Sequence, residues 1–223
     1  MVSTANTTPI TPTQVPIGEK RVVFHNISWE SYEKILEALG EHRSARLTYD
    51  CGTLEITMPL EEHESAIRLI ELFIRILVVE QGLKIKTMGS TTLNFPNLKK
   101  GAEPDNCYYI QNQPKVAGKK VDLTQDPPPD LIVEVDITHT DINKLDLYAS
   151  MGVAEFWRYN GRLLRFYKLQ NEQYKEVDNS PTFPWVEKAN LYQFLAACQD
   201  DEVEAEKSFR AWVQENVPNK SKH

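Results

Sequence analysis

The segment Asp130–Ile137 (DLIVEVDI) constrains the fold more than any other part of the chain, because it is almost wholly apolar apart from its acids. Its apolar residues are Leu131, Ile132, Val133, Val135 and Ile137. Such a run, preceded by a Pro-rich connection, predicts a strand that is buried on both faces of a sheet. By alternation, Glu134 shares one face of this strand with Asp130 and Asp136.

Glu134 needs a partner in such a strand, because a buried ionised carboxylate is costly unless a cation or strong hydrogen bonds meet it. For Glu134 alone, an ion pair with Lys or Arg and a bound metal ion are equally good explanations. A second carboxylate favours the metal. Asp105 follows Pro104 at the start of a short predicted strand, and the two acids can converge on one cation. Their oxygens suit Mg²⁺ or Mn²⁺, although an isolated Pro-Asp pair is more often a turn.

Hydrophobic periodicity and turn residues predict alternating helices and strands along the chain. In order, they are a helix over 28–39 with Ser28 as N-cap, a hairpin around Asp50-Cys51-Gly52, a helix over 61–80, strands over 84–88, 91–95, 104–110 and 130–137, a helix over 141–151 ended by Gly152, a hairpin of strands 155–159 and 163–169, and two helices from residue 187.

The predicted helix over 61–80 has apolar residues at spacings of three and four, which marks one buried face. Extending this face backwards by one turn reaches His63, with Glu62 at its edge. Both side chains are therefore expected near whatever the helix packs on. A histidine in this position is more often structural than catalytic.

The composition fits a globular protein, since 41% of the 223 residues are apolar and 26% are charged. We expect a disordered tail over 1–20, one domain over 21–200, and a C-terminal helix and polar tail over 201–223. No run approaches the roughly 18 apolar residues of a membrane span, and the N-terminus has no apolar secretory core. The three cysteines are far apart, so a reducing cytoplasm fits best.

The net charge of −7 and the pI of about 5.3 count against broad nucleic-acid binding, which depends on lysines and arginines that replace counterions along phosphates. Nucleic-acid binding is compatible with this charge only if a metal offsets local negative charge and basic residues gather on one face.

The run AEPDNCYYI is followed by PPPDLIVEVD, then by a helix with Lys144 and Tyr148, and then by GVAEFWRY. In this order the segments resemble the Uma2 family of restriction-endonuclease-like proteins, also called DUF820 and common in cyanobacteria. That family belongs to the PD-(D/E)XK nuclease superfamily. The resemblance extends from about the first helix to the last hairpin.

The resemblance implies an α/β (α+β) restriction-endonuclease-like fold, with an αβββαβ core and a mixed central sheet flanked by helices. It implies that Asp105 and Glu134 bind the metal and that the first core helix supplies Glu62 or His63. The family's E-x-K pattern would place a lysine at position 136, where this chain has Asp136.

The missing lysine matters because it steadies the attacking water or the developing charge on the phosphate. Related sequences place this function in the following helix, so Lys144 is the candidate, on one side of that helix with Asp141 and Tyr148; a solvated helix lysine is an almost equal alternative. Asp136 is either a third metal ligand or a cap of the next loop through Thr138 or His139. The aromatic residues Tyr148, Phe156 and Trp157 are expected in the core.

The implied reaction is metal-dependent hydrolysis of DNA phosphodiester bonds by an endonuclease, with Mg²⁺ or Mn²⁺ lowering the pKa of a bound water. A homodimer is expected, because one such site cuts one strand. The alternative is a catalytically inactive module of this fold that binds DNA or another protein. The acidic pI and the missing lysine favour the alternative, whereas the retained acids oppose it. A zinc hydrolase is not expected, because the chain has no H-E-x-x-H spacing.

Overall fold

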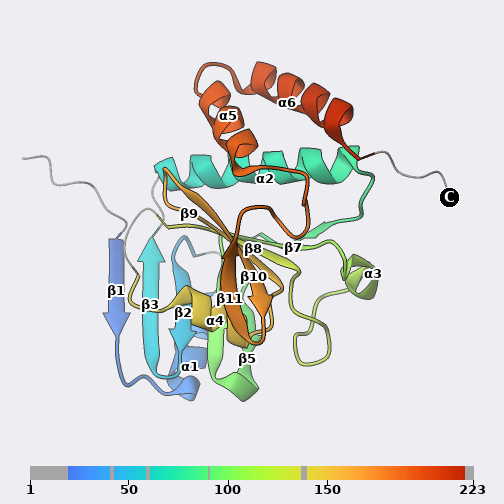
Figure 1. The fold of residues 1–223 in the computed structure, drawn as a ribbon. Helices are drawn as coiled ribbons and strands as arrows, with labels where there is room; N and C mark the ends of the chain where they lie inside the picture. The colour runs from blue at the N-terminus through green and yellow to red at the C-terminus, as the bar shows by residue number, and fades with distance from the viewer. Residues whose placement is uncertain (1–19, 41–42, 59–60, 90, 137–139, 219–223) are drawn as a thin grey trace, which may run out of the picture.

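The computed structural model describes residues 20–40, 43–58, 61–89, 91–136 and 140–218, and for residues 61–63 it describes the backbone alone. The described residues form two β-sheets and six α-helices (Figure 1). The predicted tail lies outside the described residues up to residue 19, and Lys20 already begins the first strand. None of the described helices is long and apolar enough to cross a membrane.

The larger sheet is the mixed sheet that the family resemblance implies. Its order is β11-β10-β9-β8-β7-β4, in which β8 and β9 are parallel and the other described neighbours are antiparallel. The strands are β4 (Lys86–Thr87), β7 (Asn106–Tyr109), β8 (Leu131–Val135), β9 (Glu155–Tyr159), β10 (Leu164–Gln170) and β11 (Gln173–Val177). Helix α4 (Lys144–Ser150) lies in the connection between β8 and β9, since parallel neighbours require a crossover.

The smaller sheet has the order β1-β3-β2-β6-β5. Its strands are β1 (Lys20–Phe24), β2 (Arg46–Asp50), β3 (Thr53–Met58), β5 (Leu93–Phe95) and β6 (Lys100–Ala102), and η1 (Pro96–Leu98) joins the last two. The predicted hairpin of β2 and β3 is confirmed. The strands β1 and β6 were not predicted, because one adjoins the polar N-terminal stretch and the other is three residues long and contains Gly101.

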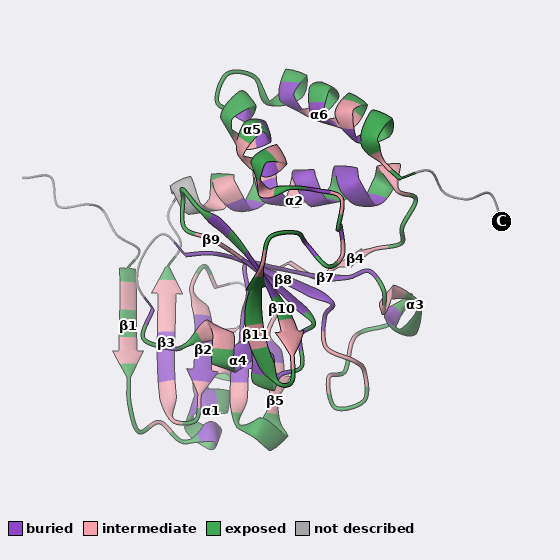
Figure 2. Ribbon diagram, viewed as in Figure 1, coloured by how far each residue is buried: buried purple, intermediate pink, exposed green. Residues whose placement is uncertain are grey.

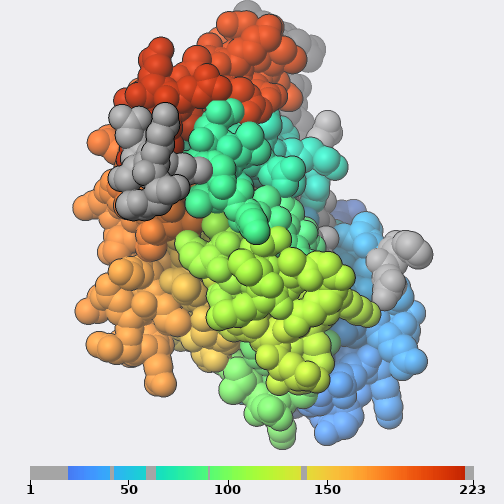
Figure 3. Space-filling model, turned by 90° about the vertical axis from the view of Figure 1, so that its right-hand side faces the viewer, coloured from blue at the N-terminus to red at the C-terminus, as the bar shows by residue number. Residues whose placement is uncertain are grey.

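Three helices lie on one side of the larger sheet, namely α2 (Glu61–Glu80), α5 (Lys188–Cys198) and α6 (Glu202–Asn216) (Figure 1). The central strand β8 presents Leu131, Val133 and Val135 to this side, in one apolar cluster with α2. Helix α6 extends the cluster, because Phe209 stacks on Phe73 of α2 with ring centroids 4.4 Å apart. In the side view the C-terminal helices α5 and α6 form one end of the molecule, away from the N-terminal strands (Figure 3).

Helix α1 (Trp29–Leu39) covers one face of the smaller sheet and begins at the predicted N-cap, where Ser28 accepts a hydrogen bond from the backbone N–H of Ser31. This helix packs on Leu47 and Leu54 through Trp29 and Tyr32. The side chains of the alternate residues, such as Arg46 and Thr48, project from the other face of the sheet. Buried residues run through the centre of the molecule, where the two sheets meet (Figure 2).

Helix α4 is shorter than the sequence predicts. It begins at Lys144 rather than at Asp141, because the side chain of Asn143 accepts a hydrogen bond from the backbone N–H of Leu145 and so caps the helix. The expectation that Asp141 shares a helix face with Lys144 and Tyr148 is therefore wrong. The short helix α3 (Gln113–Val116) precedes the Pro-rich connection and was also not predicted.

Candidate active site

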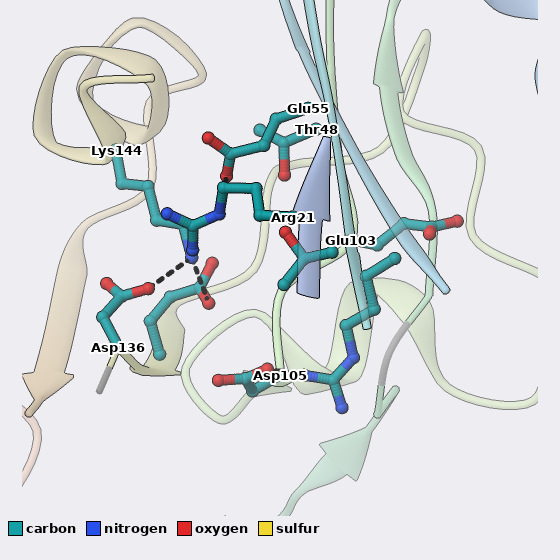
Figure 4. Close-up of a pocket in the computed structure, with 10 residues that line it drawn as sticks. Arg21, Thr48, Glu55, Glu103, Asp105, Asp136 and Lys144 are labelled. Carbon is teal, nitrogen blue, oxygen red and sulfur yellow. Dashed lines mark hydrogen bonds and ion pairs between the residues drawn. The ribbon is translucent and has the colours of Figure 1, made fainter. Parts of the chain in front are cut away.

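A small pocket lies where the two sheets meet, beside the N-terminal end of α4 (Figure 4). Its cavity volume of about 20 Å³ is enough for roughly one water-sized body. The lining is almost wholly polar: Arg21, Arg46, Thr48, Glu55, Thr57, Glu103, Asp105, Glu134, Asp136 and Lys144. Such a concentration of partly buried charge is expensive to build, so it points to chemistry rather than to packing.

Asp105 lies immediately before β7, where the chain passes from the smaller to the larger sheet. Asn106 pairs with Val133 in the antiparallel register of β7 and β8, so one further step places Asp105 opposite Glu134. The Asp105 carboxylate is 4% exposed and accepts a hydrogen bond of 2.6 Å from the backbone N–H of Val135. Its other oxygen forms an ion pair with the guanidinium of Arg46.

Glu134 is held by two groups of α4. Its Oε2 lies 2.8 Å from the Lys144 ammonium, and its Oε1 accepts a hydrogen bond from the hydroxyl of Tyr148. Burial raises the pKa of Glu134, and the nearby Asp136 carboxylate adds to the rise, although Lys144 opposes it. Burial raises the pKa of Tyr148, and the negative charge of Glu134 raises it further. The Tyr148 hydroxyl therefore stays protonated and acts as a donor.

Asp136 lies directly after β8 and is bonded through both oxygens. Oδ1 lies 2.8 Å from the Lys144 ammonium, and Oδ2 accepts a hydrogen bond of 2.9 Å from Nε of Arg158. Burial alone would raise its pKa, but the charges of Lys144 and Arg158 outweigh burial and lower it. Asp136 therefore stays ionised and fixes the Lys144 side chain from the position where the family pattern has lysine.

Lys144 is the cation at the centre of this arrangement, with a side chain that is 10% exposed. Burial would lower its pKa, yet the two carboxylates of Glu134 and Asp136 outweigh burial and raise it. The ammonium is thus charged throughout the physiological pH range. It can attract and orient negative groups, but it cannot accept a proton.

Two further carboxylates complete the wall formed by the smaller sheet. Glu55 pairs with Nε of Arg21 at 3.4 Å and accepts a hydrogen bond of 3.1 Å from the backbone N–H of Asp141, so it ties the segment before α4 to β3. Glu103 accepts a hydrogen bond of 2.8 Å from the backbone N–H of Leu47. It also receives bonds from Arg43 and Thr92.

The pocket pairs each of its acidic lining residues with a basic residue of the described part of the chain. Its five acidic lining residues, Glu55, Glu103, Asp105, Glu134 and Asp136, are matched by five basic residues, Arg21, Arg43, Arg46, Lys144 and Arg158. One more acid, Glu64, contacts Arg46 at 3.1 Å, but its side chain is 43% exposed and lies at the rim.

The donor set fits a hard divalent cation. Asp105 and Glu134 provide carboxylate oxygens from neighbouring strands, and Mg²⁺ is usually held by one or two carboxylates, with water and substrate oxygens as its other ligands. Among the residues that the structure describes, no group of three or more His, Cys, Asp or Glu side chains could hold a metal ion. Among the described side chains, Asp105 and Glu134 would hold such a cation, which would share them with their present partners, Arg46 and Lys144.

The family model that matches residues 29–196 is Uma2, described as "Putative restriction endonuclease". The match covers well over half of the chain. The chain belongs to the Uma2 family. Among solved structures, it is similar to a "putative nuclease belonging to DUF820" from Anabaena variabilis, with a TM-score of 0.51 and 15% identity over 75% of this chain and 98% of that chain. At this identity the likeness shows the fold alone. No curated protein matches.

For this Uma2 protein, the structure brings Asp105, Glu134, Asp136 and Lys144 into one pocket, as the sequence predicts. Their catalytic and metal-binding roles stay predictions. The side chains of Glu62 and His63 lie outside the described residues, as do Thr138 and His139, the proposed partners of Asp136. Tyr148 lies in the core as expected, but its hydroxyl also reaches Glu134.

Sequence reasoning missed the arginines of the Uma2 pocket. Arg46 alternates with apolar residues along its strand, which reads as a solvent-facing side, and Arg21 lies in a strand that was not predicted. Arg158 stands in the GVAEFWRY run that carries part of the resemblance, and it pairs with Asp136. Charge was the signal that could have identified these arginines. A buried strand with several acidic residues needs cations nearby, and the arginines on other strands had not been given a role.

Proposed function

We propose that this protein is an endonuclease that hydrolyses phosphodiester bonds of DNA with the help of Mg²⁺ or Mn²⁺. Family membership supports nuclease chemistry at the level of the class. The observation that carries the finer proposal is the buried Lys144 ammonium, 2.8 Å from both Glu134 and Asp136, in one pocket with Asp105.

Asp105 and Glu134 are the proposed metal ligands. When bound, the cation would lower the pKa of a coordinated water and neutralise negative charge on the phosphate. Lys144 remains protonated, so its proposed role is to hold the attacking water or to stabilise negative charge as it develops, rather than to act as a base. Asp136 and Arg158 keep the ammonium in place.

Charge balance supports this assignment. Each lining carboxylate has a cationic partner among the described residues, so a divalent cation would add positive charge to the pocket. A phosphodiester and a hydroxide carry one negative charge each and would offset this added charge in a site where unbalanced charge is costly. The negative charge of the whole chain then matters less, because the metal supplies the attraction locally.

The experiment is a cleavage assay with purified protein on single-stranded, duplex and branched DNA. Cutting is expected with Mg²⁺ or Mn²⁺ and should stop with EDTA. A parallel assay on RNA separates the two nucleic acids. Cleavage that is unaffected by EDTA would contradict the metal assignment.

The second candidate function is a catalytically inactive nuclease fold that binds DNA or a protein. One observation favours it: each acid of the pocket already has a cationic or hydrogen-bonding partner within the chain, so the pocket is stable without metal. Absence of cleavage of any DNA or RNA with every divalent cation tried, together with retained DNA binding, would establish this alternative.

We also propose that the protein acts on duplex DNA as a homodimer, because one site of this kind cuts one strand. Light scattering of the purified protein, alone and with a duplex oligonucleotide, tests this. A mass that corresponds to one protein chain alone, and to one chain per duplex with DNA, contradicts the proposal.

A further inference from the structure

A row of three polar side chains crosses neighbouring strands of the smaller sheet. Arg21 of β1 lies opposite Thr57 of β3, and Thr57 lies opposite Arg46 of β2. Residues directly opposite one another in antiparallel strands project from the same face. All three line the pocket, so the Arg21–Thr57–Arg46 row forms part of its wall.

The row stands on the face of the sheet that meets the larger sheet, not on the face that α1 covers. The side chains of Arg21 and Arg46 are 13% and 16% exposed, whereas arginines are mostly exposed unless they are paired. Neighbouring strands lie roughly 4.8 Å apart, so the two arginines are attached about 10 Å apart with the Thr57 hydroxyl between them. Figure 4 shows Arg21 directed into the pocket, on the side of Lys144 and Glu55.

Guanidinium groups suit phosphate better than ammonium groups do, because their planar forks can donate two parallel hydrogen bonds to its oxygens. In the protein alone, Glu55 lies 3.4 Å from Nε of Arg21, whereas Asp105 and Glu64 pair with the two terminal nitrogens of Arg46. These contacts position the two guanidinium groups. A cation on Asp105 would compete with Arg46 for that carboxylate and leave Nη1 of the guanidinium, the nitrogen that pairs with Asp105 rather than with Glu64, available to an anion.

We propose that the Arg21–Thr57–Arg46 row binds a phosphate group of the nucleic-acid backbone next to the metal site. The inference rests on the proposed nuclease function and names the part of the substrate that this wall recognises. Arg21 lies in β1, which precedes the family-matched segment 29–196. The proposal therefore also gives this strand a function. A backbone phosphate has no sequence information, so the row contributes affinity and position rather than base preference.

The test measures binding of a fluorescein-labelled DNA duplex by anisotropy over a range of salt concentrations, with Ca²⁺ present and the DNA shown to be intact afterwards. Arg21→Gln should weaken binding roughly ten-fold, the size of one charge-assisted hydrogen bond. It should also reduce the slope of log affinity against log salt by about 1, as expected for one lost phosphate contact. Thr57→Val should weaken binding less and leave the slope unchanged.

Two matched variants separate a phosphate contact from a structural role. Arg21→Lys keeps the charge beside Glu55 but lacks the fork, so it should keep the salt slope and lose part of the affinity. Arg75→Gln removes the same charge from an exposed position on α2, about 16 Å along the helix from Glu64, and should bind like the wild type. Thermal melting checks that each variant is folded.

The inference is overturned if the wild-type protein cuts DNA while Arg21→Gln binds with unchanged affinity and salt slope; the nuclease proposal then stands. If Arg21→Gln does not fold, wild-type affinity in both Arg21→Lys and Thr57→Val overturns the inference instead. A wild-type protein that neither cuts nor binds nucleic acid overturns the inference and the proposed function together.

Discussion

The Asp105 carboxylate accepts a hydrogen bond of 2.6 Å from the backbone N–H of Val135, on the neighbouring strand. One oxygen of Asp105, the proposed metal ligand, thus fixes the start of β7 to Val135, the residue that follows Glu134. The two acids keep their relative position because this bond joins their strands at the pocket. An amide in place of Asp105 can still accept this bond, which makes the residue suitable for a test that separates charge from shape.

Asp105→Asn should lower cleavage by on the order of 100-fold or more, because loss of even an outer partner of a metal ligand costs about 10- to 100-fold. The free energy of unfolding should fall by about 3 kcal/mol, because the ion pair with Arg46 is broken from one side even though the hydrogen bond from Val135 can be kept. Initial cleavage rates and urea unfolding measure the two effects. Asp50→Asn, at the end of β2, is the control. Undiminished cutting by Asp105→Asn would remove this residue from the site.

Lys144→Met keeps the apolar stem but removes the charge that lies between Glu134 and Asp136. Breaking a buried ion pair from one side costs about 3 kcal/mol or more, so urea unfolding should show a loss of that size, with cleavage reduced as well. Lys168→Met, on the exposed side of β10, should change neither. An unfolding free energy equal to that of the wild type would show that Lys144 is a solvated helix lysine.

Tyr148→Phe removes the hydroxyl that donates to Glu134 and leaves the ring in the core. The expected cost in unfolding free energy is about 1–2 kcal/mol, and Mn²⁺ affinity should fall about 10-fold, because partners of a metal ligand orient it. Tyr174→Phe loses a partly buried hydrogen bond, to the carbonyl of Val153 at 2.8 Å, and should keep the metal affinity. Isothermal titration with Mn²⁺ compares them, and equal affinities for all three proteins would contradict the assignment.

Stability at acid pH should depend on Asp136. Lys144 and Arg158 outweigh burial and place its folded-state pKa below the ordinary value of 3.8. The stabilising contribution is therefore complete above pH 3.8 and is lost as pH falls through the lower, folded-state pKa. Melting temperatures measured from pH 6 downward should drop more steeply for the wild type than for Asp136→Asn. Asp200→Asn, an exposed change, should follow the wild-type curve, and parallel curves for all three proteins would contradict the prediction.

The sequence was sufficient where one strand or helix carried the whole pattern. The apolar run of β8 predicted a doubly buried strand, and alternation placed Glu134 and Asp136 on one face of it. The position of Lys144 came from the family resemblance, because no local pattern distinguishes a buried helix lysine from a solvated one. The start of α4 was misplaced by three residues, since Asn143 rather than an earlier residue caps the helix.

The part that could not be predicted depends on packing between two sheets. Arg46 and Thr48 alternate with buried Leu47 and Tyr49, which from sequence alone indicates one wet face. In the folded chain the larger sheet lies against that face and turns it into a pocket wall. The contact brings together residues 21, 46, 105 and 134, and no periodicity along the chain records such a meeting.

The pairing of β1 with β3 has a practical consequence for anyone who shortens this protein. A version trimmed to the family-matched residues 29–196 would lose the partner of β3 over the five residue pairs from Lys20–Met58 to Phe24–Leu54, leaving an open strand edge to which another copy could add. At the opposite end, removal of α6 would uncover Phe73, which is otherwise completely buried. Aggregation of such a fragment would result from the loss of β1 and α6, not from an inability of this sequence to fold.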